Sequence, residues 1–302
     1  MTEFQIRLAQ LYDVEPILAF CQNTWEHQKD YMHLVLDQRI NNPERKIFVV
    51  TLDDIPVAME QVAILSQQEA WRDSLRVDSR YRGRGLSKLL DSYINNYLSQ
   101  LNIYISRYCV YSDNEIMLKI ISHRGDKKVG SYSLFKADTI ASKDNKLIQL
   151  ELKDFDSIWS LITQESLLNN RQDFYTRLIT TCQKITPELL KECLLLGKVF
   201  GLRQYQSLRG IAIQSYSEVS EEEFYLGYLH GEPAILRVLL GELCKLAYSL
   251  GNSVVRGVFP LNDIFSDALS QAAFQRIHQA EAGIYLSRNK TTGSKEEVIS
   301  NK

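Results

Sequence analysis

The chain has little of what marks several common classes of protein. Its five cysteines are scattered, odd in number and never in a Cys-x-x-Cys pair, which excludes a disulfide framework and fits a reducing cytoplasm. No His-Glu-x-x-His motif or second histidine cluster completes a metal site, so we expect no metal. No apolar run approaches the roughly 18 residues of a membrane-spanning helix. The N-terminal MTEFQIRLAQ also lacks the pattern of a signal peptide, and we expect a cytoplasmic protein with no membrane partner.

An excess of charge of one sign is also missing. Lys and Arg number 35 against 37 Asp and Glu, so no global field favours binding to a nucleic acid. Hydrophobic residues make up 45% of the 302 residues, enough for one large core or two ordinary ones. We expect a monomer or a homodimer.

What is present is an alternation of strand and helix patterns. QIRLA predicts a strand, and DVEPILAFCQ predicts a helix that Asp13 caps. KIFVVTLDDIPVAMEQVAIL predicts two strands around a turn at Asp53 and Asp54. The later segments predict, in order, a strand, a leucine-striped helix, a strand, a helix and a strand: WRDSLRV, Leu86 to Leu101, IYISRYCVY, NEIMLKIISH and VGSYSLFKA. The polar stretch DTIASKDNKL then predicts a linker.

The second half repeats this order. IRLAQLYDVEPI and IQLELKDFDSI both place an Asp four residues before an Ile, at Asp13 and Asp154. LSKLLDSYINNYLSQLN also aligns with LRVLLGELCKLAYSLGN at an offset of 150. Two matches in the same order indicate a tandem repeat of one fold. We predict domains at residues 1–140 and 146–289, followed by a disordered polar tail at 290–302.

The stretch VDSRYRGRGL stands where a strand passes into a helix. A helix N-terminus presents unpaired N–H groups and a partial positive charge. Gly83 and Gly85 allow a close approach to the backbone, and Arg80, Arg82 and Arg84 add positive charge. This pattern predicts a site for phosphate or pyrophosphate. The alternative is an exposed basic turn.

Arg80-x-x-Gly83-x-Gly85, between a strand and a helix, resembles the coenzyme A signature of the GNAT acyltransferases. The order of elements over residues 4–137 also resembles a whole GNAT domain. The resemblance implies an α/β (α+β) fold of two tandem GNAT-like domains, each a mixed, mostly antiparallel sheet flanked by helices. It also implies acetyl-CoA as cosubstrate, with its pyrophosphate on the amides of residues 81–86 and its pantetheine arm between splayed strands. The expected contacts are Leu75, Arg76, Val77, Arg80, Tyr81, Arg82, Gly83, Arg84, Gly85, Leu86, Ser87 and Asn114, of which Asn114 is equally suited to cap a helix.

Acyl transfer to an amine needs a base, an oxyanion donor and a proton for the thiolate. Alternation along the strand that ends at Val77 predicts that Asp73 shares the face of Val77, towards the substrate. Asp73 resembles the base of several family members, and Glu60 is the second choice; the alternative for each is a solvated carboxylate. As a carboxylate, Asp73 needs a raised pKa or a chain of water to act near neutrality. The resemblance implies that a backbone N–H near Val77 holds the oxyanion.

The sequence departs from the family in the helix NEIMLKIISHRGDKK. Ile120 and Ile121 stand where family members often carry a tyrosine, and no Gly-Phe follows. Tyr111, or Tyr108, is the alternative acid for the thiolate, although packing is the commoner role for such residues. Without the Gly-Phe, the chain is also similar to the GNAT proteins that resemble histidine N-acetyltransferase.

Residues 21–38 stand where these domains place the helices over the acceptor. Trp25, His27, Tyr31 and His33 are candidates to shape that pocket, with packing on a helix face as the alternative.

The offset of 150 sets Glu232, Pro233 and Ile235 opposite Arg82, Gly83 and Gly85. Glu232 repels an anion, Pro233 lacks an N–H donor, and Ile235 adds a branched side chain. We therefore predict one coenzyme per chain, with a second half that packs against the first and shapes the acceptor cleft.

The predicted function is transfer of an acetyl group from acetyl-CoA to the amine of a small molecule or amino acid. Two alternatives remain: a non-catalytic module that binds or senses acyl-CoA, and a peptide N-terminal acetyltransferase.

Overall fold

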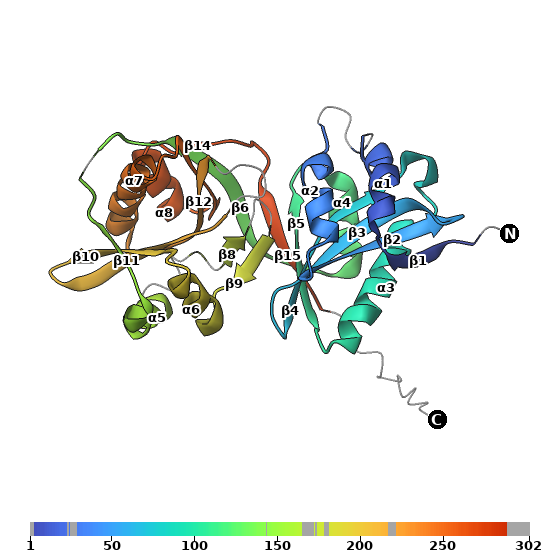
Figure 1. Cartoon of the computed structure of the whole chain (residues 1–302), viewed down its shortest axis with the longest axis horizontal. Helices are drawn as coiled ribbons and strands as arrows, with labels where there is room; N and C mark the ends of the chain where they lie inside the picture. The colour runs from blue at the N-terminus through green and yellow to red at the C-terminus, as the bar shows by residue number, and fades with distance from the viewer. Residues whose placement is uncertain are drawn as a thin grey trace, which may run out of the picture. The chain divides into compact units, whose positions relative to one another are not determined.

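The computed structural model describes residues 3–22, 24, 29–142, 144–164, 172, 174–177, 181–216 and 222–288. The chain divides into two compact units: unit 1 is Met1–Tyr108 with Leu286–Lys302, and unit 2 is Cys109–Tyr285 (Figure 1). The predicted domain boundaries at residues 140 and 146 stay a prediction, and the predicted tail from residue 290 lies outside the described residues.

Unit 1 is built on the strand order β1-β2-β3-β4-β5. The first three neighbouring pairs are antiparallel, and β4 and β5 are parallel. Its elements are β1 Gln5–Leu8, η1 Leu11–Asp13, α1 Val14–Cys21, α2 Met32–Ile40, β2 Arg45–Leu52, β3 Ile55–Ile64, β4 Glu69–Val77, η2 Ser79–Tyr81, α3 Leu86–Gln100 and β5 Ile105–Tyr111, which continues into unit 2.

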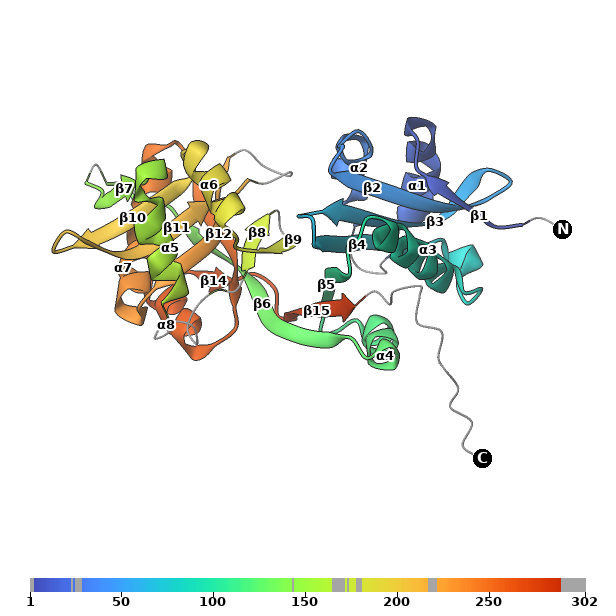
Figure 2. The ribbon, with the colours of Figure 1, turned by 90° about the horizontal axis from the view of Figure 1, so that it is seen from below.

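The two faces of this sheet carry different helices. Figure 2 shows α1 and α2 on one face of β2–β4 and α3 on the other. Met59 packs with α1 and α2, whereas Ala58 and Val62 pack with the leucines of α3. Alternation along β3 therefore gives each side of the sheet its own core. The predicted hairpin turn is present, with φ of +52° at Asp53 and +63° at Asp54, as a two-residue primed turn requires.

Unit 2 repeats this arrangement. Its strands run β7-β10-β11-β12-β13, with antiparallel pairs up to β12 and a parallel pair between β12 and β13. Helices α5 and α6 cover one face, and α7 and α8 cover the other (Figure 1). Its elements are α4 Glu115–Arg124, β6 Lys127–Asp138, β7 Leu147–Gln149, η3 Leu152–Asp154, α5 Phe155–Thr163, β8 Phe174–Arg177, β9 Thr181–Lys184, α6 Pro187–Leu195, β10 Val199–Gln204, β11 Ser207–Gln214, β12 Glu223–Gly231, α7 Pro233–Ser249, β13 Val254–Pro260, α8 Asp263–Gln271, β14 Gln275–Arg276 and β15 Ala282–Arg288, which ends in unit 1.

Strand β6 joins unit 2 although it is encoded before the predicted linker. It pairs antiparallel with β13 from Tyr132↔Pro260 to Asp138↔Val254. Phe135 and Ala137 of β6 belong to the core under α7 and α8.

The repeat extends to the caps of the first helices. Asp13 Oδ2 accepts a hydrogen bond from Gln10 N at 2.7 Å, and Asp154 Oδ2 accepts one from Glu151 N at 3.0 Å. Each carboxylate closes the same capping box before a helix. The predicted fold class, two related mixed sheets flanked by helices, is confirmed.

Candidate functional site

The glycine loop joins β4 to α3 in unit 1. Gly83 has φ of +77°, and Gly85, the N-cap of α3, has φ of +79°. Non-glycine residues rarely adopt this region. A Cβ added at either glycine would meet no atom within 4 Å, so one side of this backbone is uncovered. The two glycines are therefore required by conformation and leave space for a ligand.

The loop offers N–H donors to that space. No hydrogen bond among the described residues uses the backbone N–H of residues 83–88. The first-turn N–H groups of a helix lack partners within the helix and carry its positive end. Arg82 and Arg84 are exposed beside them. The geometry is that of an anion cradle.

The arginines of the loop have different tasks. Arg80 Nη2 lies 2.6 Å from Asp78 Oδ2, and this hydrogen bond is the main cause that lowers the pKa of Asp78. The guanidinium carbons of Arg80 and Arg84 lie 5.8 and 5.2 Å from the centre of the Tyr81 ring. Arg80 therefore shapes the turn, and Arg82 and Arg84 supply positive charge at its surface.

Strands β4 and β5 separate beside this loop. Their ladder ends at the pair Trp71↔Arg107, and the later residues of β4 pair with β3 alone. Leu75 and Val77 pack towards the α3 core. The splayed strands expected for the pantetheine arm are thus present.

Strand β4 contains a bulge that interrupts the predicted alternation of its side chains between the two faces of the sheet. Ser74 has φ of +58°, and the register with β3 shifts between Met59 and Gln61. The extra residue places Asp73 and Ser74 on the α1/α2 side, whereas Val77 packs on the α3 side. The prediction that Asp73 and Val77 share one face is therefore wrong.

Asp73 is largely shielded from solvent and is held by several groups. Its Oδ1 accepts hydrogen bonds from Gln61 Nε2 and Ser74 Oγ, both at 2.8 Å. Arg39 Nη1 lies 3.8 Å from Oδ1, and Arg45 Nη1 lies 3.9 Å from Oδ2. Only 10% of the side chain is exposed, so Asp73 is not the solvated carboxylate of the alternative interpretation.

Glu60 lies on the opposite face of the sheet. Its Oε1 accepts a hydrogen bond from Arg72 Nε at 2.8 Å, and Arg72 Nη1 lies 2.8 Å from Asp91 Oδ1 on α3. Glu60 thus belongs to a buried ion-pair network on the side away from Asp73.

The α1/α2 side also holds Tyr31 and Arg76. Tyr31 Oη lies 3.2 Å from Ser74 Oγ, and Arg76 Nε lies 2.7 Å from Asp30 Oδ2. His33 Nδ1 contacts the Asp30 carbonyl oxygen at 2.6 Å, a local contact at the start of α2. Trp25 and His27 lie outside the described residues.

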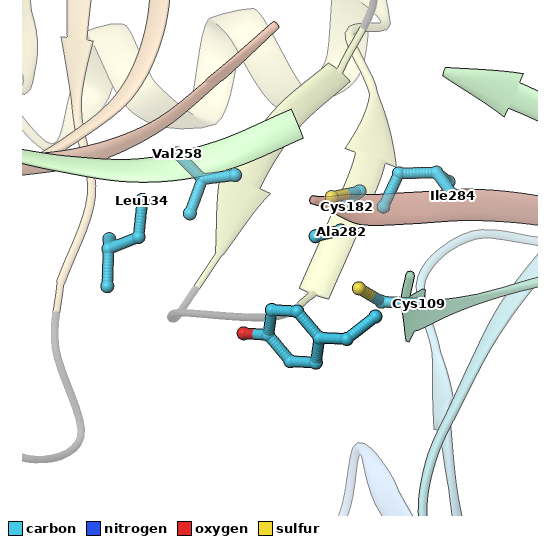
Figure 3. Close-up of a pocket in the computed structure, with 7 residues that line it drawn as sticks. Cys109, Leu134, Cys182, Val258, Ala282 and Ile284 are labelled. Atoms are coloured by element: carbon cyan, nitrogen blue, oxygen red, sulfur yellow. The ribbon is translucent and has the colours of Figure 1, made fainter. Parts of the chain in front are cut away.

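Of the remaining predicted residues, Asn114 and Tyr111 lie in unit 2, and Tyr108 is buried in unit 1. Asn114 Oδ1 accepts from Met117 N at 3.1 Å and caps α4. Tyr111 lines an apolar pocket of about 10 Å³ with residues that include Cys109 and Cys182 (Figure 3). Such a volume holds at most one water molecule. Burial raises the pKa of Cys109 to about 12, so its thiol is a poor nucleophile.

Unit 2 lacks a glycine loop of its own. Between β12 and α7 stands Glu232 alone, and Pro233 begins the helix. Ile235 is buried, and Glu232 Oε1 lies 2.8 Å from Arg209 Nη2. The start of α7 thus lacks both the glycines and one of the N–H donors that the start of α3 has.

In unit 2, a side chain that the sequence did not point to lies between β12 and β13 where these two strands separate. The β12–β13 ladder ends at Leu226↔Gly257. Just beyond it, the buried Gln172 amide donates to the Gly227 carbonyl at 2.8 Å and accepts from Leu229 N at 3.2 Å. A lone glutamine gives no sequence signal for this role.

Within the described part of the chain, no group of three or more His, Cys, Asp or Glu residues is arranged to hold a metal ion. No helix in that part is long and apolar enough to cross a membrane.

Comparisons of structure identify the fold. No family model and no curated protein matches the sequence. A GCN5-related N-acetyltransferase from Sphaerobacter thermophilus superimposes with a TM-score of 0.66 at 11% identity, covering 95% of this chain and 96% of that one. A tandem GNAT protein from the clavulanic acid biosynthesis pathway superimposes with a TM-score of 0.62 at 11% identity, covering 96% and 100%. The chain therefore has a tandem GNAT fold.

Proposed function

We propose that this chain, with its tandem GNAT fold, is an acetyl-CoA-dependent N-acetyltransferase acting on a small amine or amino acid. The observation that carries the proposal is the loop of unit 1, where Gly83 and Gly85 uncover the N–H groups at the start of α3. A diphosphate accepts hydrogen bonds from such groups and is attracted by Arg82 and Arg84.

The splayed part of β4 supports the same proposal. Pantetheine is a linear amide chain, and backbone groups of β4 beyond Trp71 that do not pair with β5 can take its hydrogen bonds. The thioester would then lie beside the part of β4 from the bulge at Ser74 to Val77, and the proposed oxyanion donor is a backbone N–H near Val77.

We assign the base to Asp73, which lies on the side of β4 that carries the bulge and Tyr31. Glu60 is the less suitable choice because Arg72 holds it on the opposite face. The role of Tyr111 as acid for the thiolate stays a prediction from the sequence.

We also propose one coenzyme per chain, bound by unit 1. In unit 2, Pro233 takes away a donor, Ile235 fills the helix start, and Gln172 occupies the backbone groups between the splayed strands. These features act on different parts of a coenzyme, so no single change in unit 2 would restore a site.

The test is isothermal titration with acetyl-CoA, followed by a free-thiol assay with amino acids and polyamines. Arg82→Glu should abolish detectable binding, whereas Arg237→Glu, a charge reversal in the first turns of α7, should leave a stoichiometry of one. Unchanged affinity in Arg82→Glu would remove the proposed site. Binding without thiol release for any amine would instead favour a coenzyme-binding module.

A further inference from the structure

The burial of Asp73 raises a question about proton transfer. With 10% of its side chain exposed and Gln61, Ser74 and two arginines around it, its carboxylate has little surface for a substrate. A base must reach its proton directly or through a hydrogen-bonded intermediary. The structure offers such an intermediary.

Three side chains form a continuous hydrogen-bonded row. Ser74 Oγ lies 2.8 Å from Asp73 Oδ1, and Tyr31 Oη lies 3.2 Å from Ser74 Oγ. Tyr31 is half-buried, so the row begins near the surface of unit 1 and ends at a buried carboxylate. Catalytic hydrogen bonds are often long before substrate binds, as the Tyr31 contact is.

The chemistry of the three groups fixes the direction of the row. An ionised carboxylate only accepts, so the single Ser74 proton points to Asp73. The Ser74 oxygen then accepts, from Tyr31 and from Arg39 Nη1 at 3.2 Å. Each hydroxyl therefore donates towards Asp73, the arrangement needed for successive proton transfers.

The backbone is strained in a way that creates this row. Ser74 is the residue of β4 with φ of +58°, which costs about 1–3 kcal/mol for a non-glycine residue. Without the bulge, Ser74 would point to the face opposite Asp73, since successive side chains of a strand alternate.

We infer that Tyr31, Ser74 and Asp73 form a proton relay for the acceptor amine, an inference that rests on the proposed function. The amine nitrogen attacks the thioester carbon, the C–N bond forms, and the C–S bond breaks with its electron pair leaving on sulfur. The amine proton passes to Tyr31 Oη as the Tyr31 proton moves to Ser74 and the Ser74 proton moves to Asp73. After product release, the proton returns to water along the same row.

The neighbours of the row suit this role. The guanidinium carbons of Arg39 and Arg76 both lie 5.6 Å from the centre of the Tyr31 ring. Their charge would offset negative charge passing through the phenol oxygen. Gln61 is a positioning residue, because its 2.8 Å hydrogen bond orients Asp73 Oδ1 towards Ser74.

The experiment compares Tyr31→Phe, Ser74→Ala and the double variant with wild type. Tyr104→Phe is the matched control, because its hydroxyl also donates to a side chain, Asn102, at 3.2 Å. The substrates are acetyl-CoA and whichever amino acid or polyamine gives the fastest thiol release. Each relay variant should lower kcat by roughly 10²-fold, and the double variant should be no slower than the slower single one. Affinity for acetyl-CoA should not change.

A proton inventory in mixtures of H₂O and D₂O provides the mechanistic readout. In wild type and Tyr104→Phe, kcat should depend on the fraction of D₂O along a curve, because several protons move in the transition state. In Tyr31→Phe the dependence should be linear. If Ser74→Ala does not fold, Ser74→Gly removes the hydroxyl while suiting a positive φ. If wild type is active but Tyr31→Phe has an unchanged kcat, the relay is overturned and the proposed function is not. The same holds if the losses of kcat in the double variant are additive. A wild type that releases no thiol with any amine overturns the relay and the proposed function together.

Discussion

Replacing Gly83 with alanine separates backbone strain from ligand contact. Gly83 has φ of +77°, where alanine costs about 1–2 kcal/mol. An added Cβ there meets no atom within 4 Å, so no clash adds to that cost. Gly251, after α7 in unit 2, is a matched control, because its φ is +86° and its added Cβ also meets no atom within 4 Å. The two substitutions should lower the free energy of unfolding by similar amounts.

Their effects on the coenzyme should differ. In Gly83→Ala a methyl group would stand where the diphosphate approaches the N–H groups before α3. Loss of two hydrogen bonds to a charged group, at about 1.5 kcal/mol each, weakens binding by roughly 100-fold. Gly251→Ala removes no donor from the proposed site, and its affinity should equal that of wild type.

Thermal denaturation measures the first effect and isothermal titration with acetyl-CoA the second. If both variants lose similar amounts of unfolding free energy and only Gly83→Ala loses much of its affinity for acetyl-CoA, the result would support the anion cradle at Gly83. If both variants bound acetyl-CoA as tightly as wild type, the uncovered backbone at Gly83 would not be the phosphate site, and the reasoning from its geometry would fail.

Other predictions concern stability and reactivity. Arg72→Leu should lower the free energy of unfolding by about 3–5 kcal/mol in urea denaturation, because it leaves the buried Glu60 carboxylate without its cation; a loss under 1 kcal/mol would contradict this. Gln172→Ala should cost about 2–4 kcal/mol, because buried backbone groups beside Gly227 lose hydrogen bonds, yet the coenzyme stoichiometry should stay at one. Since burial raises the pKa of Cys109 to about 12, its thiol stays protonated and should react slowly with Ellman's reagent at pH 8, as peptide mapping can check. For the same reason this thiol should make the protein less stable as pH rises above about 9, because the unfolded form ionises first; a urea midpoint unchanged between pH 8 and pH 10 would argue against it.

Local patterns in the sequence were sufficient for several elements of the fold. The turn at Asp53 and Asp54, the leucine stripe of α3 and the paired caps at Asp13 and Asp154 all depend on residues close together in the chain. Periodicity and capping act over a few residues, so they can be recognised without knowing what packs against them. The glycine spacing of the loop is local in the same way, and both glycines have a positive φ in the structure.

Regular alternation along β4 predicted the wrong face for Asp73 relative to Val77, because the strand contains a bulge. Ser74 takes a left-handed conformation, and every side chain after it changes face relative to Asp73. Nothing in the serine itself signals a bulge, because the register with β3 depends on pairing between two strands.

The sequence by itself determined two repeats of one fold, a basic glycine loop in the first repeat and the loss of that loop in the second. Only the tertiary structure decided which charged groups meet: Asp73 lies with Arg39 and Ser74, whereas Glu60 lies with Arg72 on the other face. It also decided that Gln172 fills the splayed strands of unit 2. Such contacts join residues distant in the chain, and their identity follows from which surfaces the whole fold buries together, because a buried polar group must find its partner wherever the packed structure supplies one.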